Sequence, residues 1–514
     1  MAALANQILR KSLSPAKLML RLGLAPAKLL LTLGPAPAKL MLRLGLAGLC
    51  LSLVLSGCTG DSGKLPSPSL PFVRKNASTP AAKEDLLALA KAMAIMKAMP
   101  CDDVRSWYYQ GAIHSIPDTV PNGNPLCQSY TRMAQMKTAW MNCTHDPMGS
   151  SELHFLIWHR LYIWHFEKIV RALSGKTDFA LPYWDYCDPN YRVMPALLRD
   201  PADSLFESAR LGSLNAGEPI DTFMNARLDM TNNNESKLYS LFDSQIDAAP
   251  HGAMHNYIGG QYAGDSTLWN RIYQGPNYGL MAQVESAGFD PIFWLHHANI
   301  DYLWQKWDMS ANGARPILED LLRQPWAYVF FDETGKKVEY SIQSAFEQAF
   351  NMDYIYDSLP VAPKMLNLQK PVPENPHEIL SSDLEESISA PLHSIAIKTP
   401  GTKPMQMQAQ VAARRVTVLE VTVGFTQQPR LDYQVYIDTD KPEERKLAGI
   451  MTFFGAMHMQ KPAAEYTKLF RFDITDEYDV NTMGKTVKLL IVNSKGQKAT
   501  EISVKKVRIE TRDF

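Results

Sequence analysis

The stretch DPIFWLHHANID, from Asp290 to Asp301, limits the possible folds of this 514-residue chain more than any other segment. If it forms a helix, Phe293, His297 and Asp301 lie on one face, because residues four positions apart stand one turn above another. A histidine held by a ring on one side and by a carboxylate on the other has the surroundings of a metal ligand. The stretch therefore predicts a helix that carries a metal-binding histidine.

A second phrase, FLIWHRLYIWHFE, repeats this pattern earlier in the chain. Phe155 precedes His159 by four residues, and Glu167 follows it by eight. We interpret the two phrases as halves of one site, in which Phe155 and Glu167 surround and orient His159 as their counterparts do in the later helix.

Nine of the twelve histidines lie between His114 and His297. Among them, His251 and His255 are four residues apart and share one face of a predicted helix. Imidazole ligands without thiolate or carboxylate favour copper or zinc over magnesium or calcium. The candidate metal ligands form two groups of three: His114, His145 and His159, then His251, His255 and His297.

The first 58 residues differ from the rest of the chain. They contain three copies of an 11-residue unit that is too short and too often interrupted by proline to form a solenoid. From Met41, a candidate start, a short apolar run ends in LSGC at Cys58 and resembles a bacterial lipoprotein signal peptide. We expect acylated Cys58 to hold an exported protein at the outer membrane, in the periplasm or at the cell surface. An ordinary signal peptide or a membrane anchor is the alternative.

Four cysteines lie beyond this leader. An exported protein can form disulfides, and Cys101 with Cys127 is a candidate pair, whereas Cys187 is expected to be an inert buried thiol. Lysine and arginine together number 52 against 53 for aspartate and glutamate, a net charge of -1. This balance predicts no nucleic acid partner.

The spacing of apolar residues in the sequence changes near residue 312. Before it, apolar residues recur at helical spacing, as in DLLALAKAMAIMKAM. Beyond about residue 395, segments such as VTVLEVTVGF alternate with period two, which predicts an antiparallel β-sandwich of about seven strands. We expect an α+β multidomain fold, a mainly helical bundle followed by this sandwich. The expected divisions are a leader at 1–58, a linker at 59–80, the histidine-bearing domain at 81–312, a small linker domain at 313–360, a proline-rich linker at 361–394 and the sandwich at 395–514.

The two histidine phrases resemble the copper-binding signatures of the tyrosinase and polyphenol oxidase family of type 3 copper proteins. QPWAYVFFDETGKKV is similar to the small linker domain of plant polyphenol oxidases, and KLFRFDITDE to their C-terminal sandwich. The resemblance covers the chain from about Lys83 to its end. It implies copper A on His114, His145 and His159, and copper B on His251, His255 and His297.

Two of these assignments involve a choice. In the doublet, His297 takes the ligand role because it is four residues from both Phe293 and Asp301, and its neighbour takes a structural role. Family members usually place the middle copper A ligand closer to His159 than His145 is, which leaves His154 as the alternative.

We favour His145, because Cys143-Thr-His145 matches the arrangement in which some family members join the cysteine to the histidine by a thioether bond. On a helix, His154 would point away from the metal that His159 binds.

The resemblance implies an oxidase that uses O₂ and two copper ions to convert small o-diphenols to o-quinones. Hydroxylation of monophenols also needs a base, which in active members is a water held by an asparagine and a glutamate. Here these positions correspond to Gly252 and Asp247, so we favour diphenol oxidation. An o-aminophenol oxidase and an oxygen carrier similar to haemocyanin are the alternatives. In the family the sandwich covers the copper site, and the candidate covering residues are Phe453, Phe454 and Met457.

Overall fold

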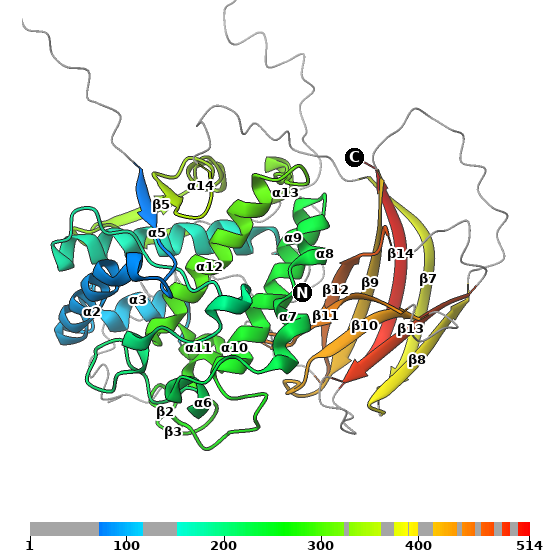
Figure 1. Cartoon of the computed structure of the whole chain (residues 1–514). Helices are drawn as coiled ribbons and strands as arrows, with labels where there is room; N and C mark the ends of the chain where they lie inside the picture. Colours follow the sequence, from blue (N-terminus) through cyan, green and yellow to red (C-terminus); the bar gives the residue numbers. More distant parts are fainter. Residues whose placement is uncertain are drawn as a thin grey trace, which may run out of the picture. The chain divides into compact units, whose positions relative to one another are not determined.

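The computed structural model describes parts of the chain from Pro71 onward (Figure 1). The described ranges are 71–116, 152–322, 328–360, 375–388, 390–398, 415–438, 445–457, 464–476, 486–493 and 502–513. The expectations for the leader, Cys58, Cys127, Cys143 and His145 lie outside these ranges.

Four helices carry most of the core of the helical half: α2 (Lys83–Ala98), α3 (Trp107–His114), α5 (Phe155–Ser174) and α12 (Pro291–Asp308). Helices α2 and α12 both contact α5. The shorter helices are α6 (Gly212–Ala216), α7 (Asn225–Leu228), α8 (Thr231–Glu235), α9 (Tyr239–Ile246), α10 (Ala253–Ile258), α11 (Val284–Ala287), α13 (Leu318–Leu321) and α14 (Ile342–Ala349). Among the helices of the described ranges, none is long and apolar enough to cross a bilayer.

Helix α12 lies inside the core, and its sequence defines where it begins. Pro291 occupies the first turn, and the Asp290 side chain accepts a hydrogen bond from the backbone N–H of Ile292 at 3.0 Å. Arg210 lies 2.6 Å from the same carboxylate in a fully buried ion pair. Every residue from Pro291 to Trp304 is buried, as in a helix surrounded by other elements.

Short strand pairs attach distant segments to these helices. Strand β1 (Phe72–Arg74) runs parallel to β6 (Tyr354–Tyr356). Strands β4 (Tyr328–Phe331) and β2 (Trp269–Asn270) run antiparallel to β5 (Lys337–Tyr340) and β3 (Gly275–Pro276), respectively. Strands β4 and β5 with helix α14 lie in the segment 313–360, which the sequence analysis expects to form the small linker domain.

Two four-stranded antiparallel sheets form the C-terminal sandwich, drawn from yellow to red in Figure 1. Their orders are β11-β10-β13-β8 and β12-β9-β14-β7, and their inner faces share one apolar cluster. The strands are β7 (Asn375–Ser387), β8 (Leu392–Lys398), β9 (Arg415–Phe425), β10 (Tyr433–Asp438), β11 (Lys446–Met451), β12 (Tyr466–Asp473), β13 (Thr486–Asn493) and β14 (Ser503–Asp513).

The sandwich begins earlier in the chain than the sequence indicates. Strand β7 starts at Asn375 and β8 at Leu392, inside the segment predicted to be a proline-rich linker. Strand β7 is an edge strand that pairs with β14 and buries Leu380. Because its sequence, NPHEILSSDLEES, faces mostly solvent, it lacks the apolar alternation that identifies the other strands.

The sandwich contacts the helical half through apolar and charged side chains. An apolar cluster joins α9 and the residue before it to β9, through Leu238, Leu241, Val416 and Val418. Arg227 of α7 and Asp432 form an ion pair whose side chains are 2% and 1% exposed. The second contact of this pair joins Nη2 to Oδ1 at 3.0 Å. These contacts place the sandwich against the helices that surround the histidines.

Candidate metal centre

Helices α3, α5 and α12, with the turn Asp247–Gly252 and helix α10, bring histidines from four parts of the chain together. The candidate ligand atoms within each of two groups lie within 4.8 Å of one another. One group contains His114, His159 and His297, and the other contains His251, His255, His296 and His297. Because His297 belongs to both, two metal positions would be neighbours.

A backbone carbonyl holds the Nδ1 atom of four of these rings. The Nδ1 to oxygen distances are 2.9 Å from His114 to Val284, 2.8 Å from His159 to Phe155, 3.1 Å from His251 to Asp247 and 2.8 Å from His255 to Met281. A carbonyl only accepts, so each ring carries its proton on Nδ1 and presents Nε2 as its basic atom. Such bonds orient neutral imidazoles for metal binding.

His297 shows that this centre fits a metal. Among the described residues, neither of its ring nitrogens has a hydrogen-bond partner, although the residue is 1% exposed. Burial first, and then the neighbouring imidazoles, hold the pKa of His297 well below its ordinary value, so the ring is neutral. A buried polar atom without a partner is costly, and coordination by a metal ion would remove that cost. The donor set suits copper or zinc.

Two phenylalanine rings enclose the centre, and both are 1% exposed or less. The ring centroid of Phe155 lies 4.8 Å from that of His159 and 4.7 Å from that of His251, while Phe293 lies 4.3 Å from His297 and 4.7 Å from His114. These contacts restrict rotation of the imidazoles and exclude water from around them.

Glu167 and Asp301 bond to arginines rather than to histidines, which differs from our expectation. Arg74 lies 2.8 Å from Glu167 Oε2 and 3.0 Å from Asp301 Oδ2, and Arg160 lies 2.5 Å from Asp301 Oδ1. Burial alone would raise the pKa of Asp301, but Arg160 and Arg74 lower it. Eight residues of helix span about 12 Å, so Glu167 is too far along α5 to reach His159. The two carboxylates instead fasten α5 and α12 to β1.

His154 does not join either histidine group. It is buried just before α5, and its Nδ1 lies 2.6 Å from the hydroxyl of Tyr328 in β4. Burial lowers the pKa of His154 to about 4. These contacts give it a structural role, while the other candidate for the middle ligand, His145, lies outside the described residues with Cys143.

Two cysteines lie in the described ranges. Cys101 is disulfide-bonded, and its expected partner, Cys127, lies outside those ranges. Cys187 is a half-buried free thiol, and burial raises its pKa well above the ordinary value. A thiol in this state is unreactive.

The segment after β11 reaches the histidines. The ring of Phe454 stacks on that of His255, with centroids 4.0 Å apart and planes 13° apart, and lies edge-on to His251 at 5.7 Å. Phe453 lies in the sandwich core, and Met457 packs against that core. Of the three candidate covering residues, Phe454 therefore contacts the metal centre.

Gly252 and Asp247 lie under this segment. A Cβ atom added to Gly252 would be 2.9 Å from Thr452 Oγ1 and 3.2 Å from Phe454 Cβ, so the sandwich fits closely over the glycine. The Oγ1 of Thr452 donates to the Ala248 carbonyl at 2.9 Å. Asp247 Oδ1 lies 3.0 Å from His251 Nδ1, so this carboxylate contacts a candidate ligand.

The sequence interpretation missed the position of His296. Its ring lies 4.7 Å from that of His255 and 5.3 Å from that of His251. The hydroxyl of Tyr186 lies 2.8 Å from its Nδ1. The His296-His297 doublet could have indicated this position, because adjacent residues of a helix point about 100° apart and both can border one cavity.

Comparison with known proteins agrees with this geometry. The family model described as the common central domain of tyrosinase matches residues 104–210 and 199–310. A chloroplastic polyphenol oxidase of Malus domestica is 25% identical over 448 residues, which cover 75% of this chain and 69% of that protein. Tyrosinase HcTyr1 of Hahella sp. (strain CCB-MM4) is 25% identical over 424 residues, which cover 77% and 88%.

Solved structures share the fold. Latent apple tyrosinase superposes with a TM-score of 0.58 at 21% identity, over 87% of this chain and 98% of that one. Latent aurone synthase superposes with a TM-score of 0.60 at 19% identity, over 89% and 93%. Both likenesses extend beyond the helical half into the sandwich.

The helical bundle and its two adjoining histidine groups define a type 3 copper protein, whose cofactor is a pair of copper ions. Residues 104–310 match the common central domain of tyrosinase, and most of the chain is similar to polyphenol oxidases and tyrosinases, as the two histidine phrases predicted. It is a copper oxidase that acts on phenols.

Proposed function

We propose that this protein oxidises o-diphenols to o-quinones with O₂. Copper A is assigned to His114, His145 and His159, and copper B to His251, His255 and His297. The observation that carries the proposal is the meeting of two buried histidine groups at His297 within a tyrosinase domain. When bound there, a copper pair supplies O₂ binding and accepts the electrons of the phenol.

The protein's own contribution is to hold neutral imidazoles in place. The carbonyls of Val284, Phe155, Asp247 and Met281 keep a proton on each Nδ1, which leaves each Nε2 basic. The rings of Phe155 and Phe293 supply the apolar wall that a phenol ring prefers and that excludes water.

Diphenol oxidation is favoured over hydroxylation by the residues beside His251. Gly252 has no side chain to hold a water, and a larger residue there would meet Thr452 and Phe454. The carboxylate of Asp247 is directed to His251 Nδ1 at 3.0 Å. A base for the phenol proton is therefore less available than in a hydroxylase, and a catechol loses its protons more readily than a monophenol.

The protein is proposed to be latent until the sandwich is displaced. Phe454 stacks on His255 where a substrate ring would lie. Two solved structures of the same fold are named as latent forms.

Export and lipidation form the remaining part of the proposal. The LSGC sequence ending at Cys58 supports an acylated, exported protein that contacts the membrane through its lipid alone. Labelling cells with a radioactive fatty acid tests this: the protein should take up label, and Cys58→Ser should not. Equal labelling of both would rule out the anchor at this residue.

Oxygen uptake and quinone formation by the copper-loaded protein test the activity. We expect turnover of 4-methylcatechol, little of tyramine, and a rise of at least tenfold after proteolytic cleavage near Pro371. Phe454→Ala should raise catechol turnover without cleavage, whereas Met457→Ala, the matched control in the sandwich, should not. Faster turnover of o-aminophenol would change the substrate class. Reversible O₂ binding with no substrate consumed after cleavage would indicate a carrier.

A further inference from the structure

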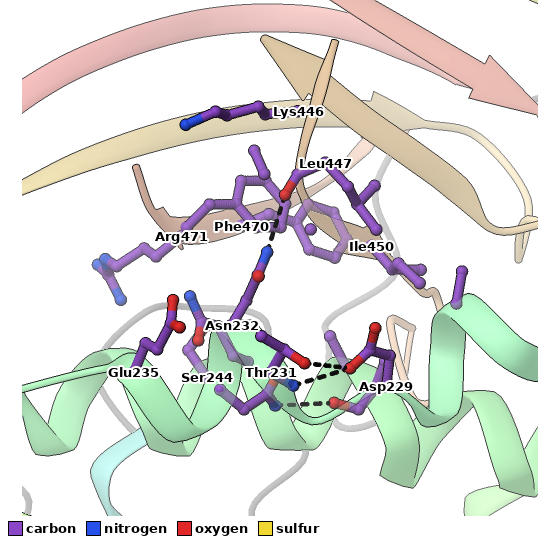
Figure 2. Close-up of a pocket in the computed structure, with 18 residues that line it drawn as sticks. Asp229, Thr231, Asn232, Glu235, Ser244, Lys446, Leu447, Ile450, Phe470 and Arg471 are labelled. Atoms are coloured by element: carbon purple, nitrogen blue, oxygen red, sulfur yellow. Dashed lines mark hydrogen bonds between the residues drawn. The ribbon is translucent and has the colours of Figure 1, made fainter. Parts of the chain in front are cut away.

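A cavity lies where the segment from α7 through α9 to Ala249 faces strands β11 and β12 of the sandwich (Figure 2). Its volume is about 400 Å³, which suits a small organic molecule. It is separate from the histidine groups, which do not line it. Figure 2 shows Asn232 spanning it, where its Nδ2 donates to the Leu447 carbonyl at 2.8 Å.

The two walls of the cavity carry opposite charges. Asp229 and Glu235 lie on the helical wall, and Asp229 Oδ1 accepts hydrogen bonds from the backbone N–H and the hydroxyl of Thr231 at 2.9 and 2.6 Å. Lys446 and Arg471 lie on the strand wall. Lys446 uses one of its three N–H donors on the Asp476 carbonyl at 2.9 Å, and Arg471 donates its Nε to Glu420 at 2.9 Å. A molecule bound here would meet negative charge below and positive charge above.

A buried polar atom and an apolar surface also line the cavity. Gln245 is 8% exposed, and its Oε1 accepts a hydrogen bond from Ser236 at 2.9 Å. Its Nε2 has no partner among the described residues. A buried amide N–H costs free energy until an acceptor reaches it. Ile450 and Phe470 supply the apolar surface on the strand side.

We propose that this cavity binds a free α-amino acid with an aromatic or large apolar side chain. The ammonium group lies towards Asp229 and Glu235, and the carboxylate lies towards Lys446. The side chain packs against Ile450 and Phe470. A zwitterion is favoured over a simple cation or anion because each of its charges faces the opposite charge.

Binding at this place stabilises the covered form of the metal centre, an effect that depends on the latency proposed above. Ala248 and Ala249 line the cavity and precede His251, while β11 lines it and leads to Thr452 and Phe454. A ligand whose charges are shared between the two walls binds best when the walls are together. It therefore favours the closed arrangement by linkage.

Calorimetry on the copper-loaded, uncleaved protein tests the site with L-phenylalanine, which has no phenol group to be oxidised. We expect saturable binding and a rise in Tm of about 2 °C at tenfold excess over Kd. The analogues 2-phenylethylamine and 3-phenylpropanoate, which each lack one charge, should bind at least tenfold more weakly. Absence of saturable heat, or equal binding of either analogue, would overturn the proposal.

Substitutions of the charged residues that line the cavity test whether L-phenylalanine binds there. Glu235→Gln and Lys446→Gln should each weaken L-phenylalanine binding about tenfold, whereas Lys337→Gln, in an exposed pair far along the chain, should leave it unchanged. Unchanged binding in both cavity variants would place the ligand elsewhere and overturn the assignment.

The effect on latency has its own readout. Saturating L-phenylalanine should slow proteolytic activation several-fold in the parent protein and leave it unchanged in Glu235→Gln. An equal rate with and without ligand in the parent would overturn the coupling. If cleaved protein fails to oxidise catechol, the proposed function fails while the binding result stands, so the two failures are distinguishable.

Discussion

Burial determines how His154 and His165 titrate. Burial lowers the pKa of His154 to about 4 and that of His165 to about 3, against about 6.5 in an unfolded chain. Between those values the unfolded chain binds more protons than the folded one. Stability is therefore fully present above pH 6.5 and is lost as the pH falls through this window.

The variant His154→Gln tests this, because glutamine does not titrate and can still bond to Tyr328. At pH 5 the titration of His154 should cost the parent protein about 2 kcal/mol, so its Tm should fall about 2–4 °C more between pH 7.5 and pH 5 than that of the variant. The control is His393→Gln in β8, whose half-buried side chain pairs with Glu386. Identical falls in the parent and in His154→Gln would mean that the buried ring takes up no proton on unfolding.

Gly252 provides a second prediction, because the space above it is filled by the sandwich. In Gly252→Ala the new methyl group must displace Thr452 or Phe454. We expect a loss of about 1–3 kcal/mol in stability and a several-fold rise in catechol turnover without cleavage. Gly212→Ala is the matched control, since a Cβ there meets nothing within 4 Å. A stable Gly252→Ala protein with unchanged turnover would contradict the covering role of Phe454.

Most of the histidines that the structure brings together were identifiable from the sequence, but their hydrogen-bond partners were not. Spacing identified His251 and His255 because a helix repeats at a known period. The carbonyls of Val284 and Met281 that orient His114 and His255 come from segments distant in sequence, and a backbone carbonyl has no residue-type signature. For the same reason, no pattern showed that Phe454 rather than Phe453 faces the centre.

Among the structural elements, strand β1 is only three residues long, but its Arg74 connects the two histidine-bearing helices. Arg74 is fully buried and bonds Glu167 of α5, Asp301 of α12 and the hydroxyl of Tyr356 in β6. Burial would lower the pKa of Arg74, but the surrounding tyrosines and carboxylates raise it well above its ordinary value, so it remains charged. Arg74 thus holds both histidine-bearing helices, α5 and α12, to strands β1 and β6.

Arg74→Met should destabilise the protein by about 3–5 kcal/mol, because it leaves two carboxylates buried without their shared cation. Thermal unfolding and copper content would both be measured, and both should fall. Lys337→Met is the control, because its partner Glu339 is 57% exposed and such surface pairs contribute about 0–1 kcal/mol. A fall in Tm with full copper content would show that β1 supports the fold without orienting the histidines.

Elements with a local sequence signal were predictable, and those without one were not. Helix α12 begins at its Asp290-Pro291 signal, and strands β10 and β12 alternate between buried and less buried residues. Strand β7 follows no such pattern, because its partner β14 covers only one edge and most of its side chains face solvent. Its position depends on pairing with residues more than a hundred positions later, which local sequence does not encode.

In the whole molecule, the helical half and the sandwich were each predictable from the sequence, but the contact between them was not. Arg227 and Asp432 are ordinary charged residues in the sequence, and their burial arises only when the sandwich docks on α7. The same is true of Thr452, whose hydroxyl bonds to Ala248 near the histidines. The proposed latency is thus a property of the docked halves rather than of either motif.

Asp432→Asn tests whether this contact controls access to the metal centre. Loss of the charge leaves Arg227 buried without its counter-ion, at a cost of about 3–5 kcal/mol to docking. If the sandwich acts as a cover, the variant should be activated faster by protease and should oxidise 4-methylcatechol several-fold faster before cleavage. If the sandwich only adds stability, Tm should fall while uncleaved turnover stays at the parent level. Asp513→Asn, which removes a pair with Arg415 within the sandwich, controls for general weakening of that domain. Activation by Asp432→Asn alone would therefore assign the effect to docking.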